Sequence, residues 1–211
     1  MNIFNEYWDE YDRWYEENPV LYQKELRVIL ETLEDIKYSI PKDSLEIGVG
    51  TGRFMKGLNF STGIDVGKNL VENAKRQGLN VLEGRAEEIP FLDESFSCVG
   101  IFTALEFFDD IEQAFSEIKR VLKKDGYLLL SYLNKNSIEV QNIEENKEKD
   151  KWFSQARFYQ MEELKLLLNS YSFEIVGAKQ LVFNHFEPCI VNGNTDGMYC
   201  VLVAKNRKGN T

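Results

Sequence analysis

Residues 45–54 read Leu-Glu-Ile-Gly-Val-Gly-Thr-Gly-Arg-Phe, and residues 63–65, Gly-Ile-Asp, follow shortly after them. The three glycines leave a short apolar run and enter a helical stretch, so the backbone there can approach a ligand where a Cβ would clash. Asp65 stands 17 residues after Gly48, at the end of the next apolar run, where its carboxylate can accept both hydrogen bonds of a ribose diol. These residues predict a nucleoside or dinucleotide site on a parallel sheet.

The spacing of the glycines distinguishes a nucleoside site from a dinucleotide site. A dinucleotide turn reads G-x-G-x-x-G, whereas this chain reads G-x-G-x-G, with Glu46 two residues before the first glycine. A carboxylate beside a phosphate-binding turn would repel pyrophosphate, but it suits a ligand that carries an ammonium group. The pattern therefore favours a nucleoside with an ammonium group. A nicotinamide-dependent oxidoreductase stays open as an alternative, as does a plain tight turn without a ligand.

Apolar runs alternate with helical ones along the chain, which is typical of βαβ units on a parallel sheet. Seven strands are expected, at residues 44–47, 61–65, 79–82, 96–102, 127–132, 173–183 and 198–204. Helices are expected at residues 20–36, 68–77, 109–124 and 161–170. We expect the last two strands to form an antiparallel hairpin at the edge of the sheet, and residues 144–151 to form an exposed helix or a mobile loop.

Composition excludes several classes of function. The 211 residues hold 25 basic and 35 acidic side chains, a net charge of −10 that disfavours binding to nucleic acid. His185 is the single histidine, so a metal site that needs two or three histidines cannot form within one subunit, and no metal is expected. Cys98, Cys189 and Cys200 lack CxxC spacing and indicate reduced thiols. No apolar run reaches a membrane span, and the acidic N-terminus is unlike a signal peptide. We expect a cytoplasmic protein without a membrane partner.

The glycine stretch resembles motif I of the class I S-adenosylmethionine-dependent methyltransferases. Further segments match this family in order: residues 83–91 resemble its G-x-A-E-x-L-P-F stretch, residues 95–110 its fourth strand and following loop, and residues 121–126 its L-K-P-G-G turn. The resemblance covers about residues 40–205 and is closest to the UbiE-like branch with methyltransferase domain 11. Two departures stand out, because Phe107-Phe108 replaces a frequent His-His pair and Lys124-Asp125-Gly126 replaces Pro-Gly-Gly.

The resemblance implies an α/β, Rossmann-like fold: a seven-stranded, mostly parallel sheet with an antiparallel last strand, a helical cap at residues 1–40 and a helical insert after the fifth strand. Residues 41–211 would form the methyltransferase domain, with residues 134–160 inserted near the substrate. The implied cofactor is S-adenosyl-L-methionine, and the product is S-adenosyl-L-homocysteine. The residues expected to bind the cofactor are Tyr11, Trp14, Glu46, Gly48, Gly50, Thr51, Gly52, Asp65, Val66, Ala86, Glu87, Phe102, Thr103, Ala104 and Leu105.

Aromatic residues concentrate in the first 22 positions, and Tyr11-Asp12-Arg13-Trp14 resembles a Y-D-x-W segment of this branch. The segment is either a helix packed on the domain or a lid over the cofactor, whose aromatic faces would favour the sulfonium cation. The sulfonium is already a strong leaving group, so in-line methyl transfer mainly needs alignment and exclusion of water. No catalytic residue is assigned; the candidates are Thr103, Glu106 and Arg157, with His185 a weaker one.

The acceptor is expected to be a small or neutral molecule, and the protein a monomer or homodimer. A non-catalytic S-adenosylmethionine-binding protein stays open as a further alternative. A cysteine-dependent arsenite methyltransferase is disfavoured, because Cys98 falls inside an expected buried strand.

Overall fold

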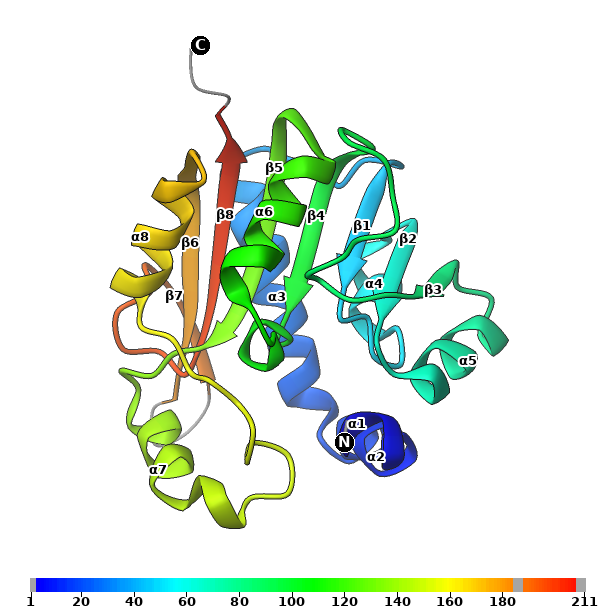
Figure 1. Ribbon diagram of the computed structural model, residues 1–211. Helices are drawn as coiled ribbons and strands as arrows, with labels where there is room; N and C mark the ends of the chain where they lie inside the picture. Colours follow the sequence, from blue (N-terminus) through cyan, green and yellow to red (C-terminus); the bar gives the residue numbers. More distant parts are fainter. Residues whose placement is uncertain (1–2, 184–187, 208–211) are drawn as a thin grey trace.

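A single eight-stranded sheet forms the centre of the molecule in this computed structural model, which describes residues 3–183 and 188–207 (Figure 1). Its strand order is β3-β2-β1-β4-β5-β8-β6-β7. The strands are β1 (Ser44–Ile47), β2 (Thr62–Asp65), β3 (Val81–Glu83), β4 (Phe96–Phe102), β5 (Leu122–Leu133), β6 (Phe173–Phe183), β7 (Pro188–Asn192) and β8 (Tyr199–Asn206). Strands β3, β2, β1, β4 and β5 are parallel to one another, and β8 is antiparallel to both β5 and β6. The α/β, mostly parallel architecture with an antiparallel last strand is thus confirmed.

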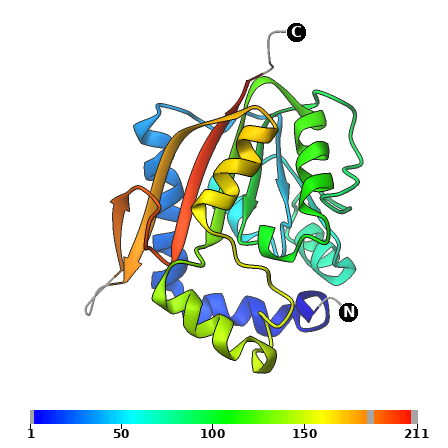
Figure 2. The same ribbon diagram turned by 60° about the vertical axis from the view of Figure 1, so that its left-hand side comes forward.

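Helices cover both faces of the sheet, and each face buries its own apolar cluster (Figure 2). On one face, α6 (Ile111–Val121) and α8 (Met161–Ser170) pack on alternate residues of β4, β5 and β8. On the other face, α3 (Pro19–Asp35), α4 (Arg53–Leu58) and α5 (Lys68–Arg76) cover the intervening residues. The near-continuous burial of the central strands follows from this double cover.

The sheet has one strand more than the sequence predicted. Residues Pro188–Asn192, expected to be a loop, form β7 and pair antiparallel with β6 at the edge of the sheet. Pro188 is its first residue, a position where the missing N–H costs no ladder bond. The last two expected strands, β6 and β8, pair antiparallel as predicted, but their predicted position at the edge is wrong. β8 inserts between β5 and β6, since its side chains are buried on both faces and an edge would expose one of them.

Several predicted boundaries move, two of them for local reasons. Helix α6 begins where the Asp110 side chain accepts a hydrogen bond from the Gln113 N–H, but it ends at Val121 rather than at residue 124. Leu122 is already extended and pairs with Phe96, so β5 begins five residues earlier than expected. The third strand lies at Val81–Glu83 instead of residues 79–82.

The carboxyl ends of the parallel strands point toward one end of the molecule, where the short N-terminal helices and the insert lie (Figure 1). These helices are α1 (Ile3–Glu6), α2 (Trp8–Glu17), α7 (Ile138–Asn146) and the 3₁₀ turns η1 (Leu105–Phe107) and η2 (Lys147–Lys149). Helix α3, by contrast, lies along the sheet against β6 and β8. None of the described helices is long and apolar enough to cross a membrane. His185 lies outside the described residues.

Candidate active site

A cavity of about 700 Å³ opens at the carboxyl ends of β1, β2 and β4. Its floor is the loop after β1, and one side is formed by residues that follow β2 and β3. The opposite side comes from α1, α2 and residues 151–155 of the insert. Ligands of open α/β sheets bind at this edge, where strand order reverses between β1 and β4.

The glycines of the loop after β1 shape the floor of the cavity. Gly48, Gly50 and Gly52 have φ of 74°, 54° and 88°, a region that side chains rarely adopt. A Cβ on Gly48 would collide with the Cβ of Ala104, so the loop packs directly on the segment after β4. No atom lies within 4 Å of where a Cβ of Gly50 would stand, so this backbone faces open space. The floor can therefore touch a ligand directly.

Asp65 ends β2 and fixes the loop from the side. Its Oδ2 accepts a hydrogen bond of 2.8 Å from the Gly50 N–H, and its Oδ1 accepts one of 2.7 Å from the Gly67 N–H. Burial raises the pKa of this carboxyl, while the two N–H donors oppose the rise. A carboxylate has about four acceptor sites, so both oxygens keep a lone pair for a ligand diol.

Glu46 is 1% exposed and lines the cavity from the centre of β1. Its Oε2 has no hydrogen-bond partner among the described residues. Burial, followed by the nearby charge of Asp65, raises its pKa well above the usual range of a carboxyl. A buried carboxyl without a partner costs free energy, which a cationic ligand group would recover.

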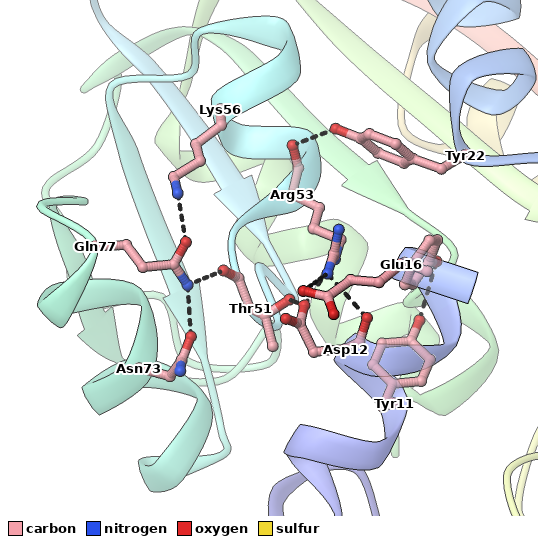
Figure 3. A network of polar contacts seen from close by, with 10 residues as sticks. Tyr11, Asp12, Glu16, Tyr22, Thr51, Arg53, Lys56, Asn73 and Gln77 are labelled. Atoms are coloured by element: carbon pink, nitrogen blue, oxygen red, sulfur yellow. Dashed lines mark hydrogen bonds and ion pairs between the residues drawn. The ribbon is translucent and has the colours of Figure 1, made fainter. Parts of the chain in front are cut away.

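Hydrogen bonds to Asp12 hold helix α2 against the glycine loop (Figure 3). The Asp12 Oδ1 accepts hydrogen bonds from Thr51 Oγ1 at 2.6 Å and from Arg53 Nε at 2.7 Å. Arg53 also donates to the backbone oxygen of Asp12 at 2.9 Å, and the Tyr22 hydroxyl donates to the backbone oxygen of Arg53 at 2.8 Å. The N-terminal segment thus closes one side of the cavity by polar contacts that converge on the loop itself.

Aromatic rings line the other half of the cavity. Phe4 lies edge-on to Phe107, with ring centroids 4.9 Å apart, and stacks on Trp152 at 5.4 Å. Tyr11 packs against both Phe4 and Trp152, and Lys151 lies 3.8 Å from the centroid of the Tyr7 ring. We call α1, α2 and residues 150–155 the cover, because their side chains meet above this half of the cavity. Residues 144–149 are helical and mostly exposed, as expected, and residues 151–155 of the insert reach the cavity.

The structure brings most of the expected cofactor residues to one cavity. Those that line it are Tyr11, Glu46, Gly48, Gly50, Thr51, Asp65, Val66, Ala86, Glu87, Phe102, Thr103 and Ala104. Three others do not line it. Trp14 is 41% exposed, Leu105 is buried in the core beneath, and Gly52 caps α4 next to Leu79.

The candidate catalytic residues lie at different depths. Thr103 lines the wall with a φ of 48°, held by hydrogen bonds from its N–H to Ser131. Glu106 is 2% exposed; its Oε1 accepts from the Leu133 N–H at 2.7 Å, while its Oε2 has no partner among the described residues. Arg157 is exposed outside the cavity and lies over the ring of Tyr159.

Sequence reasoning missed Arg53 and Trp152, which line the cavity, and the buried Glu25, which does not line it. Glu25 is buried on α3, and it had a signal: it occupies the apolar stripe of this helix, three residues from Tyr22 and from Val28. The only local signal for Trp152 was an aromatic residue within a charged segment. The pairing of Arg53 with Asp12 joins residues 41 positions apart, and nothing local indicates it.

Comparisons with known proteins agree with this geometry. The model of a methyltransferase domain family matches residues 45–130. The uncharacterized protein MJ1123 of Methanocaldococcus jannaschii is 36% identical over 188 residues, which cover 89% of this chain and 88% of that protein. The ubiquinone/menaquinone biosynthesis C-methyltransferase UbiE of Hahella chejuensis is 31% identical over 106 residues, 43% of each chain.

A solved structure is similar over nearly the whole chain. It is a SAM-dependent methyltransferase of Thermotoga maritima, described as a possible histamine N-methyltransferase, with a TM-score of 0.86 and 33% identity over 97% of this chain and 98% of that one. The chain therefore belongs to the class I S-adenosylmethionine-dependent methyltransferases. The site fits their cofactor, because the unpartnered Glu46 can receive an ammonium group and the space beside Gly50 can admit a ligand.

Proposed function

We propose that this protein transfers a methyl group from S-adenosylmethionine to a small-molecule acceptor. The observation that carries the proposal is one cavity with two unlike halves. The glycine loop, Glu46 and Asp65 form a polar half, and the rings of the cover form an aromatic half next to it. The cofactor supplies an activated methyl group on a sulfonium. The polar half suits the cofactor, and the aromatic half suits the acceptor.

Each residue of the polar half has a definite part in this proposal. Asp65 would accept hydrogen bonds from the ribose diol, and Glu46 would pair with the ammonium of the methionine end. Ala86 and Glu87 would flank the adenine, with Val66 beside it. Thr103 and Ala104 would face the sulfonium side with Phe102, and Tyr11 would offer the face of its ring to the cation. These residues bind, orient and exclude water, which is most of what methyl transfer requires.

A small acceptor is supported by the walls of the aromatic half. The cover closes this half by contacts such as Phe4 with Phe107 and with Trp152, so a long chain or a nucleic acid has little room. Arg53 and Lys151, which line the cavity, already pair with Asp12 and Glu10. The similar Thermotoga maritima protein is described as a possible histamine N-methyltransferase, and histamine is a small molecule. We further propose that the protein is cytoplasmic, which agrees with the free, buried thiols of Cys98 and Cys200, and that it is a monomer or homodimer.

The proposal is tested by calorimetry and by methyl transfer. We expect the purified protein to bind S-adenosylmethionine and S-adenosylhomocysteine, but not NAD. Incubation of a metabolite extract with S-[methyl-¹⁴C]adenosylmethionine should label at least one small molecule. Binding of NAD without S-adenosylmethionine would overturn the proposal. Binding of S-adenosylmethionine without labelling would identify a cofactor-binding protein that does not transfer.

A further inference from the structure

The cover consists of two parts that come from distant segments of the chain. One part is α1 with α2, residues 3–17, and the other is the turn formed by residues 150–155 of the insert. An ion pair, a cation–π contact and two ring contacts join the two parts. We call this set of contacts the seam, and its residues are Phe4, Tyr7, Glu10 and Tyr11 on the N-terminal part and Lys151 and Trp152 on the turn.

The seam separates the aromatic half of the cavity from solvent. Phe4, Tyr11 and Trp152 line the cavity on the inner side of the seam. The Glu10 side chain on the outer side is 50% exposed. Lys151 lines the cavity while its side chain is also 36% exposed, so the wall is one side chain thick at this point. Parting of the seam therefore connects the cavity directly with solvent.

The N-terminal part is anchored to the two turns that hold the proposed cofactor. Asp12 holds α2 against the glycine loop. The second anchor is Asn5, whose Oδ1 accepts a hydrogen bond of 2.7 Å from the Asn69 N–H and whose backbone oxygen accepts one of 2.9 Å from Asn69 Nδ2. Asn69 lies in the first turn of α5, just after Gly67, whose N–H donates to Asp65. Neither anchor uses an atom of the insert.

The turn of the insert has its own attachments, which use no atom of α1 or α2. The Asp150 Oδ1 accepts hydrogen bonds from the Trp152 N–H at 2.8 Å and from the Phe153 N–H at 2.9 Å, so the turn is a preformed unit. The Arg157 N–H donates to the backbone oxygen of Glu106 at 2.8 Å and ties the end of the turn to the segment after β4. The turn can therefore part from α2 without breaking any of these bonds.

The polar contact of the seam is weaker than those at the anchor on the glycine loop. The Lys151–Glu10 pair joins two partly exposed side chains, and pairs of this kind contribute little and are screened by salt. At the anchor, the side chains of Asp12 and Arg53 are each 23% exposed, and the shielded carboxylate accepts charge-assisted hydrogen bonds. Local opening follows the weakest contacts, so the seam opens before α2 leaves the glycine loop.

We propose that the seam is the entrance of the methyl acceptor, and that it opens while α2 stays on the glycine loop. Lys151 and Glu10 hold this entrance closed. The acceptor and its methylated product pass between α2 and the turn of residues 150–155 without release of the cofactor. This inference rests on the proposed function and adds the route by which the site exchanges its acceptor.

Hydrogen exchange measured by mass spectrometry tests the separate opening of the turn without any acceptor. In the protein saturated with S-adenosylhomocysteine, Lys151→Gln should speed the exchange of the amides of residues 150–157 at least threefold, because the turn parts from α2 more often. Residues 8–17 and the dissociation constant of S-adenosylhomocysteine should both stay within a factor of two. Lys149→Gln, the same change at an exposed position of the insert, should alter nothing. Equal acceleration in both segments, or none in residues 150–157, would overturn the inference.

A cross-link across the seam tests the route itself. Glu10→Cys and Lys151→Cys are combined with Cys189→Ser, which removes an exposed thiol, whereas Cys98 and Cys200 are buried. A bismaleimide that contains a cleavable disulfide then joins the two introduced thiols. We expect the linked protein to lose at least nine-tenths of its methyl transfer to a metabolite extract, and to regain it when a reductant cleaves the linker. Its dissociation rate for S-adenosylhomocysteine should stay within a factor of two.

A link of the same kind within one helix is the control. Asp9→Cys and Arg13→Cys, one turn apart on α2, should change neither transfer nor release of S-adenosylhomocysteine when they are linked. Transfer that persists in the protein linked across the seam would overturn this inference and leave the proposed function standing. Where no acceptor in the extract is labelled, the hydrogen-exchange result still decides the inference. Failure to bind S-adenosylmethionine would instead refute the proposed function.

Discussion

At the scale of single residues, the carboxylate of Asp65 has two roles. It fixes the Gly50 and Gly67 N–H groups, and it presents its remaining lone pairs to the cavity. Asp65→Ala removes charge-assisted hydrogen bonds, each worth about 1.5–3 kcal/mol. We therefore expect the affinity for S-adenosylmethionine to fall by at least that amount in calorimetry.

A control for this change lies on the neighbouring strand. Glu83 pairs in register with Asp65 but is exposed, so Glu83→Gln should bind the cofactor as the unchanged protein does. An Asp65→Ala protein with full affinity would show that the ribose is held elsewhere.

Local signals made the polar half of the site predictable. Positive-φ glycines, an acid at the end of the next strand and Glu46 are all encoded within about 20 neighbouring positions, and they reach one cavity as expected. Glu25 and Trp152 could not be placed in this way. The burial of Glu25 depends on the packing of α3 against β6 and β8, and the place of Trp152 depends on the insert reaching the cavity; both follow from packing between distant segments. A charged residue within an apolar stripe is the one local sign of such a buried carboxyl.

At the scale of elements, α2 is held to the glycine loop by Asp12. Asp12→Ala removes its hydrogen bonds to Thr51 and Arg53, whose side chains are partly shielded. We expect the cofactor to be held more weakly by about 1–2 kcal/mol, a factor of roughly 5–30 in its dissociation rate. Stopped-flow displacement of S-adenosylhomocysteine measures this rate.

The same helix offers a matched control. Asp9 pairs with Arg13 at 3.6 Å, and both side chains are 60% exposed. Exposed pairs of this kind contribute little, so Asp9→Ala should leave the dissociation rate unchanged. Equal rates for Asp12→Ala and the unchanged protein would mean that α2 does not control the exchange of the cofactor.

The order of the strands shows where prediction from sequence stops. The apolar run of β4 indicates burial on both faces, but the sequence does not say which strands flank it, and the equally buried β8 was expected at the edge. The pairing of β8 with β5 joins residues more than 60 positions apart in the sequence. The pairing of β7 with β6 at the edge joins residues about 10 positions apart. Only the whole fold determines these neighbours.

At the scale of the whole molecule, four buried carboxyls set the dependence of stability on pH. Burial raises the pKa of Glu25 to about 8 and of Glu106 to about 7, and it raises the pKa of Glu46 and of Asp65 as well. Between about pH 4.5 and pH 8, the folded protein therefore binds protons that the unfolded chain has lost. Stability without ligands should fall as the pH rises through this window.

Urea unfolding at pH 5.5 and at pH 8 tests this expectation. The lowered pKa values of Asp43, Glu87 and Glu117 act in the opposite sense, and their contribution is lost only as the pH falls through those lowered values. Glu25→Gln should reduce the loss of stability between the two pH values, and Glu34→Gln should not. A stability that rises from pH 5.5 to pH 8 would contradict the burial of these carboxyls.

The cover has a consequence for how the protein can be observed. Trp8, Trp14 and Trp152 are the three tryptophans of the sequence, and all lie in the cover. Trp152 stacks on Phe4, whereas the sheet and its other helices hold no indole. The intrinsic fluorescence of the protein excited at the indole band therefore reports on the cover alone. Ligand binding and release can be followed by emission in the unlabelled protein, without interference from the core.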